Sequence, residues 1–140
     1  MSEKQVMPRV FRALGYDVDR DAISIIDYGG KGNLPLFIEI CRRARIPSVT
    51  VFDSDVRGHL RPSDELLRLD RRLRRAAGRG RYVEFDPDLE GILRLPRRRS
   101  KPEQAVARIR SLSPDEIPSL LRLVVELTVA NAHPVTPSYC

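Results

Sequence analysis

Residues 46–55 read Ile-Pro-Ser-Val-Thr-Val-Phe-Asp-Ser-Asp, an apolar β-branched run that ends in two carboxylates. A run of this kind, without polar alternation, is typical of a strand buried on both faces of a parallel sheet. Residues 22–28 form a similar run, and residues 82–85 are predicted as a third strand; each is followed by a polar or glycine-rich loop. Helical patterns lie between them, with apolar residues three or four positions apart. This alternation predicts an α/β fold, with a parallel sheet flanked by helices.

The helices have recognisable ends. The pattern over residues 3–14 stops at Gly15 and contains Pro8, so its ordered part is expected to begin near Val6, or the chain begins abruptly inside this element. Asn33 is the predicted N-cap of a helix whose expected core stripe is Leu36, Phe37, Ile40, Cys41 and Ala44. Ser63 caps a helix with Leu66, Leu69 and Leu73 on one face, arginines largely on the others, and Gly78 at its end.

Two capping boxes, Ser100-x-x-Glu103 and Ser113-x-x-Glu116, predict two more helices, the second interrupted or restarted at Pro118. We therefore expect an α/β domain over residues 1–96, a small C-terminal helical appendage over 97–130 and a disordered tail over 131–140. No apolar run reaches the length of a membrane span, and no secretory signal precedes the first helix pattern. The two cysteines form neither a disulfide framework nor a zinc-ligand spacing, and together these features favour the cytoplasm.

The charge of the chain is concentrated in one segment. The 140 residues carry 25 basic and 19 acidic side chains, a net charge of +6. Residues 57–101 hold 14 of the basic and 7 of the acidic ones, which is +7, so the remainder is slightly acidic. This excess predicts an anionic partner such as DNA. The alternative is that the arginines only solvate a helix face.

Polar residues follow each predicted strand: Gly29-Gly30-Lys31, then Asp53-Ser54-Asp55, then residues 86–90 with Asp88 and Glu90. The carboxyl ends of parallel strands meet at one edge of the sheet, where ligands bind. Alternate residues leaving a strand point the same way, so Asp53 and Asp55 can present carboxylates to one point. Oxygen ligands of this kind suit Mg²⁺, and Lys31 can meet an anion. No P-loop, dinucleotide fingerprint, zinc spacing or Ser-His-Asp set accompanies them.

These residues resemble a known family. The series Leu14-Gly15-Tyr16-Asp17, Gly29-Gly30-Lys31-Gly32-Asn33, Phe52-Asp53-Ser54-Asp55 and Asp88-Leu89-Glu90 is similar to the Toprim nuclease domain of OLD-family (overcoming lysogenization defect) endonucleases. The resemblance covers most of residues 2–95. It implies a Toprim-like, Rossmann-like sheet over 1–96 that lacks its first strand and the first glutamate of the family's Glu-Gly-x-x-Glu motif.

The resemblance also implies a function, namely divalent-metal-dependent cleavage of DNA phosphodiester bonds, if the catalytic set is complete. Glu3, Asp53, Asp55 and Lys31 would be catalytic, and Glu3, Asp53, Asp55 and Glu90 would hold Mg²⁺ or Mn²⁺. The residues expected to contact nucleic acid are Lys31, Arg57, Arg71, Arg72, Arg75, Arg97, Arg98 and Arg99. In the family an ABC-type ATPase precedes the Toprim domain, so such a region is an expected partner beside DNA. A homodimer stays open, and no membrane partner is expected.

Two other functions stay open. The chain can be a non-catalytic module that binds nucleic acid or a partner through its arginine-rich helix, or it can be a remnant without nuclease activity. Dependence on a divalent metal separates the first alternative from a nuclease.

Overall fold

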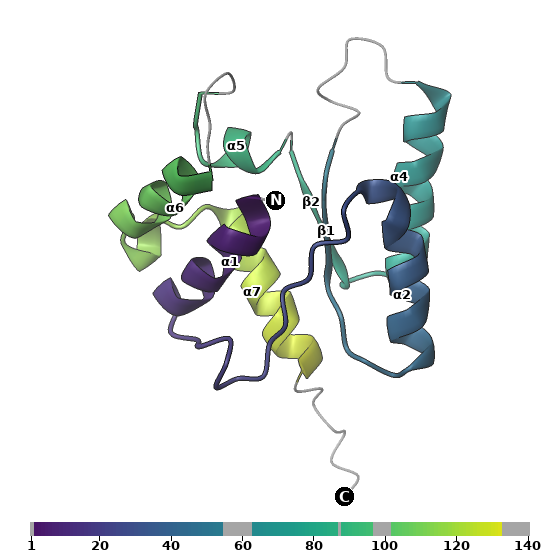
Figure 1. Ribbon diagram of the computed structural model, residues 1–140, viewed down its shortest axis with the longest axis horizontal. Helices are drawn as coiled ribbons and strands as arrows, with labels where there is room; N and C mark the ends of the chain where they lie inside the picture. Colours follow the sequence, from purple (N-terminus) through teal and green to yellow (C-terminus); the bar gives the residue numbers. More distant parts are fainter. Residues whose placement is uncertain (1, 55–62, 87, 97–101, 133–140) are drawn as a thin grey trace, which may run out of the picture.

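The computed structural model describes residues 2–54, 63–86, 88–96 and 102–132. Figure 1 shows strands β1 (Thr50–Asp53) and β2 (Tyr82–Phe85) at the centre, side by side and parallel. Thr50 pairs with Tyr82 and Asp53 with Phe85, so both strands end at the same edge. Helix α4 (Asp64–Ala77) belongs to the connection between them. The α/β class with a parallel sheet is confirmed.

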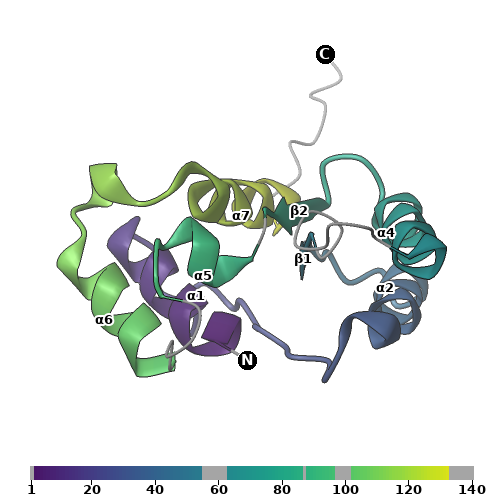
Figure 2. The same ribbon diagram turned by 90° about the horizontal axis from the view of Figure 1, so that it is seen from above.

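Helices cover the sheet on both sides (Figures 1 and 2). One side carries α2 (Leu34–Arg43), which follows the 3₁₀ turn Lys31–Asn33, together with α4. The other side carries α1 (Ser2–Ala13), α6 (Pro102–Ser111) and α7 (Ser119–Ala132). The short helix α5 (Leu89–Ile92) follows β2, and a second 3₁₀ turn, Pro114–Glu116, precedes α7. No helix in these described ranges has both the length and the apolarity needed to cross a membrane.

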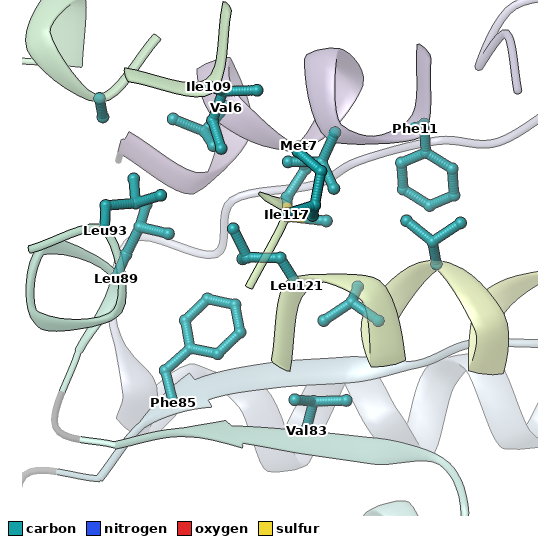
Figure 3. Close-up of a cluster of buried hydrophobic side chains, with 14 residues drawn as sticks. Val6, Met7, Phe11, Val83, Phe85, Leu89, Leu93, Ile109, Ile117 and Leu121 are labelled. Atoms are coloured by element: carbon teal, nitrogen blue, oxygen red, sulfur yellow. The ribbon is translucent and has the colours of Figure 1, made fainter. Parts of the chain in front are cut away.

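Two clusters of buried apolar side chains lie against the sheet. The large core includes Val6, Phe11, Val83, Phe85 and Leu121, and Figure 3 shows these side chains converging from α1, β2 and α7. It also takes in Ala105 and Ile109 of α6, so that α6 and α7 pack with α1 and β2. The small core consists of Leu34, Ile38, Phe52 and Leu73, between α2, α4 and β1. The domain boundary expected at residue 96 stays a prediction.

Most of the expected helices are present. Helix α1 already begins at Ser2 and continues through Pro8, because buried Val6 and Met7 hold its first turns in place. The Oγ of Ser63 caps α4 by accepting the Leu66 N–H at 3.3 Å, and Gly78 ends the helix with a φ of 86°. The Ser113–Glu116 capping box is present, and α7 restarts after Pro118. Ser100 lies outside the described residues.

Three expectations are wrong. Residues 22–28 form no strand, because a strand requires a neighbour to pair with, and β1 pairs with β2 instead. On α2 the buried residues are Leu34 and Ile38, whereas Leu36 and Ile40 of the expected stripe are 63% and 47% exposed. In residues 34–41 of this helix only Glu39 is charged, so periodicity does not define the buried face there. Residues 131 and 132, expected in the tail, complete α7, and the Asn131 amide donates to the Leu127 carbonyl at 2.8 Å.

Candidate functional site at the carboxyl end of the sheet

A groove of about 780 Å³ runs beside β1, on the edge opposite to β2. Residues 22–31 form one wall and residues 46–53 form the other, and the last turn of α7 contributes to its lining. Among the predicted site residues, Glu3, Lys31 and Asp53 all line this groove. The structure therefore brings together three residues that are separated by up to 50 positions in the sequence.

Asp53 is the last residue of β1, and its side chain is half-buried. Beyond it the chain is still held by the sheet, because the Ser54 N–H donates to the Phe85 carbonyl at 2.7 Å and Ser54 is buried. The carboxyl end of β1 is thus fixed to β2 one residue past the strand. Asp55, the second predicted carboxylate of this pair, lies outside the described residues.

Lys31 does not extend into solvent. Its ammonium forms an ion pair with the carboxylate of Asp70 on α4, and its Nζ also donates to the backbone carbonyl of Asp53 at 2.7 Å. The ring centroid of Phe52 lies 5.2 Å from the same nitrogen. The positive charge of Lys31 is thus paired with a carboxylate inside the protein. The expected contact of Lys31 with phosphate stays a prediction.

The other two predicted acidic ligands lie on different helices. Glu3 is in the first turn of α1, and Glu90 is in α5, half-buried after β2. Asp88 caps α5 through its Oδ1, which accepts the Gly91 N–H at 2.7 Å, so this carboxylate has a structural use. Among the residues that the structure describes, no group of three or more His, Cys, Asp or Glu side chains has the arrangement of a metal site. Asp55 is not among these residues.

The arginines of α4 divide into two kinds. Arg71, Arg72 and Arg75, all predicted to contact nucleic acid, are exposed. Arg74 instead donates through Nε and Nη2 to the Glu84 carboxylate on β2, at 2.8–3.1 Å. This hydrogen bonding raises the pKa of the Arg74 guanidinium above its ordinary value. Arg57, Arg97, Arg98 and Arg99 lie outside the described residues.

Sequence reasoning missed Asp70. It is 1% exposed, although it belongs to a helix in which charged side chains were expected on the solvent side. A signal was present, because Asp70 follows Leu66 by four positions and precedes Leu73 by three, which places it on the apolar face. A single carboxylate on such a face predicts a buried cationic partner.

Tyr28 was not predicted to be part of the site either. Its ring stacks on Phe37 with centroids 3.9 Å apart, and burial raises the pKa of its hydroxyl.

Comparisons with known proteins agree with this architecture. Residues 1–55 match the family model described as "Overcoming lysogenization defect protein-like, TOPRIM domain". The chain is also 29% identical, over 131 aligned residues, to the OLD nuclease of Thermus scotoductus, an alignment that covers 84% of this chain. It covers 25% of that relative, so the chain spans about a quarter of its length. The resemblance to the OLD-like Toprim domain is confirmed.

Proposed function

We propose, from the OLD-like Toprim match of residues 1–55, that this chain is a nuclease domain that hydrolyses phosphodiester bonds of DNA with the help of Mg²⁺ or Mn²⁺. The observation that carries the proposal is the position of Asp53. It ends β1 at the edge where both strands terminate, and it lines one groove together with Glu3. This is the edge at which parallel α/β sheets bind their ligands.

The described carboxylates of the groove are ligands of the kind that a hard cation prefers. Glu3 and Asp53 offer carboxylate oxygens to the same groove, and Mg²⁺ is usually held by one or two carboxylates while water and phosphate oxygens complete its shell. Asp55, two residues after Asp53, and Glu90 on α5 are the further proposed ligands. A bound cation would supply an activated water and stabilise the leaving oxygen. The carboxylates would hold it and orient the phosphate against the groove.

The proposed DNA surface is the exposed side of α4. Arg71, Arg72 and Arg75 extend from it into solvent, whereas Arg74 is engaged by Glu84. Phosphate contacts of this kind position a duplex without reading its sequence. We propose that Arg57 and the series Arg97, Arg98 and Arg99 extend this surface, and that the ATPase of a longer OLD-like protein acts with it on the same DNA.

Thermal stability and cleavage test the metal site together. Clustered carboxylates repel one another, and a cation that binds only the folded state stabilises it by mass action. We expect millimolar Mn²⁺ to raise the Tm, Asp53→Asn to abolish that rise, and the matched control Asp115→Asn, in the 3₁₀ turn before α7, to retain it. An identical Tm in EDTA and in Mn²⁺ would contradict the site. Mn²⁺-dependent nicking of plasmid, lost in Asp53→Asn, would establish the reaction.

The groove supports one further part of this proposal. The edge of β1 that faces the groove is not used by β2, and an additional parallel strand there would complete the sheet. We propose that such a strand, placed ahead of Ser2 with a glutamate at its end, raises the Tm and the nicking rate together. We also propose that the 140 residues alone cleave DNA weakly or not at all. Vigorous EDTA-sensitive cleavage by the 140-residue chain, lost in Asp53→Asn, would contradict this.

A second function is favoured by the exposed arginines alone, namely binding of nucleic acid without cleavage. In that case affinity for a duplex persists in EDTA and falls with salt, with a slope of about −0.9 per phosphate neutralised. Titration of one duplex at several salt concentrations measures this slope for the original chain and for Arg71→Gln/Arg75→Gln. A flat salt response, or the absence of binding at low salt, would assign these arginines to solvation of the helix.

A further inference from the structure

Lys31 and Asp70 form a charged pair in the interior beside the proposed site. Asp70 is 1% exposed, and the side chain of Lys31 is 14% exposed. Removing two charges from water is costly, and a buried pair of this kind is retained only where geometry and additional hydrogen bonds offset that cost. Leu73 lies on the same face of α4 and belongs to the small core, so an apolar residue at position 70 would continue the pattern. Stability alone therefore does not explain why an ion pair is buried at this position.

The sequence brings Lys31 to this place through a loop. Gly30 has a φ of 153°, a conformation that residues with a Cβ rarely adopt, and Lys31 follows it as the first residue of the 3₁₀ turn before α2. From there its ammonium reaches across the end of β1 to α4. One side chain thus connects the loop, the strand and the helix.

The contact with β1 involves one particular peptide group. The N–H groups of Thr50 and Ser54 donate to Arg81 and Phe85, at 2.9 and 2.7 Å, so these alternate residues face β2. The carbonyl of Asp53 faces the opposite edge of the strand, and there it accepts from Lys31 Nζ at 2.7 Å. The carbonyl of Asp53 and the N–H of Ser54 belong to the same peptide unit. That unit is therefore held from both sides, by Phe85 on β2 and by the ammonium of Lys31.

We infer that Lys31 and Asp70 are a positioning pair for the carboxylate at the end of β1. Asp70 holds the ammonium of Lys31, and Lys31 holds the peptide from which the Asp53 side chain and the chain toward Asp55 both depart. The consequence for metal binding rests on the proposed function, whereas the consequence for the strand end does not. Neither residue needs to touch the substrate in this role.

The test replaces the pair by apolar residues of similar size, in Lys31→Met/Asp70→Leu. Such replacements of buried ion pairs are often neutral or stabilising, so the global fold is expected to persist. Amide hydrogen exchange then compares Ser54 with Thr50, at the two ends of β1 in the same sample. We expect exchange at Ser54 to accelerate about tenfold relative to Thr50, because the peptide has lost a hydrogen bond from a charged donor.

A second readout is the affinity for Mn²⁺, measured by paramagnetic resonance without DNA. We expect it to fall in the double variant by about tenfold, the change that corresponds to the loss of one such contact. The matched control is Arg74→Gln/Glu84→Gln, which removes another pair between α4 and the sheet. It is expected to leave both readouts unchanged. If the double variant does not fold, Asp70→Asn, which is almost identical in size, carries the same comparison.

Each outcome is decisive. Unchanged protection of Ser54 overturns the inference, and so does faster exchange at Ser54 with undiminished Mn²⁺ affinity, because the pair would then be structural only. Faster exchange together with weaker Mn²⁺ binding supports it. If the original chain binds no Mn²⁺, the proposed function fails, and the exchange at Ser54 still decides whether the pair holds the strand end.

Discussion

The two faces of the sheet are stabilised in different ways. Among the residues that the structure describes, fourteen buried apolar side chains form the large core toward α1, α6 and α7. The small core toward α2 and α4 has four in the same part of the chain, and beside it lie the ion pairs Lys31–Asp70 and Arg74–Glu84. Apolar contacts are non-directional, whereas charged hydrogen bonds fix the distance and direction between two atoms. We infer that the large core supplies most of the folding free energy and that, on the small-core side, the Lys31–Asp70 pair determines where the end of β1 lies.

The largest effect is expected in the large core. Phe85 on β2 is completely buried, so Phe85→Ala removes its ring contacts and leaves a cavity. We expect a loss of about 3–5 kcal/mol in the free energy of unfolding, measured by urea denaturation. Ile26→Ala, at a side chain that is 59% exposed, is the control and should cost less than about 0.5 kcal/mol. Comparable losses in the two variants would contradict the assignment of the core.

A smaller loss is expected in the small core. Ile38 on α2 is 8% exposed, and Ile38→Ala should cost about 2 kcal/mol, the lower end of the range for such truncations. Leu36→Ala on the same helix is the matched control, and it should cost less than about 0.5 kcal/mol because Leu36 is exposed. A greater loss at position 36 than at 38 would reinstate the stripe that the sequence alone suggested.

The Arg74–Glu84 pair should contribute less again. The side chain of Arg74 is 40% exposed, so solvent screens the attraction although the geometry is bidentate. A double-mutant cycle with Arg74→Gln and Glu84→Gln is expected to give a coupling of about 0.5–1 kcal/mol. The exposed pair Glu39–Arg43 on α2 serves for comparison and should give a smaller coupling. A coupling at Arg74–Glu84 that is no larger than at Glu39–Arg43 would show that partial burial does not strengthen the ion pair.

The smallest effect concerns pH. The N–H and hydroxyl of Ser113 both donate to the Glu116 carboxylate, at 3.1 and 2.9 Å, and they lower its pKa below the ordinary value. Because the folded state favours the ionised form, this contribution is complete above the unfolded pKa of about 4.3 and is lost as the pH falls through the folded pKa. Thermal melts between pH 3 and about 7 should show a smaller acid-induced decrease in Glu116→Gln than in the original chain. Equal decreases in Tm would show that the Glu116 carboxylate does not stabilise the folded state.

The sequence predicts local elements well and their pairing less well. Residues 82–85 form the expected strand because two aromatic residues and a valine lie between Gly80 and Asp86. Residues 22–28 have an equally suitable composition, but composition does not supply a neighbouring strand. Asp53 could be placed at the ligand-binding edge because the ends of parallel strands share an edge, whereas Glu3 was expected there only from the family resemblance. Lys31 was expected there because it follows residues 22–28, although these form no strand. The burial of Lys31 could not be predicted, because it depends on Asp70, which lies 39 positions later in the sequence. Asp70 belongs to a helix of which only the arginines were predicted to be functional.

Pro8 leaves α1 with one backbone hydrogen bond fewer near its start. Proline lacks an N–H, so the Lys4 carbonyl receives no hydrogen bond from position 8, and buried Val6 and Met7 lie in the turn that follows Glu3. Apolar contacts of this kind weaken on cooling, whereas the peptide that joins Asp53 to Ser54 is held by two hydrogen bonds, one of them from a charged donor. We therefore expect cooling to weaken the start of α1, which carries Glu3, more than the end of β1.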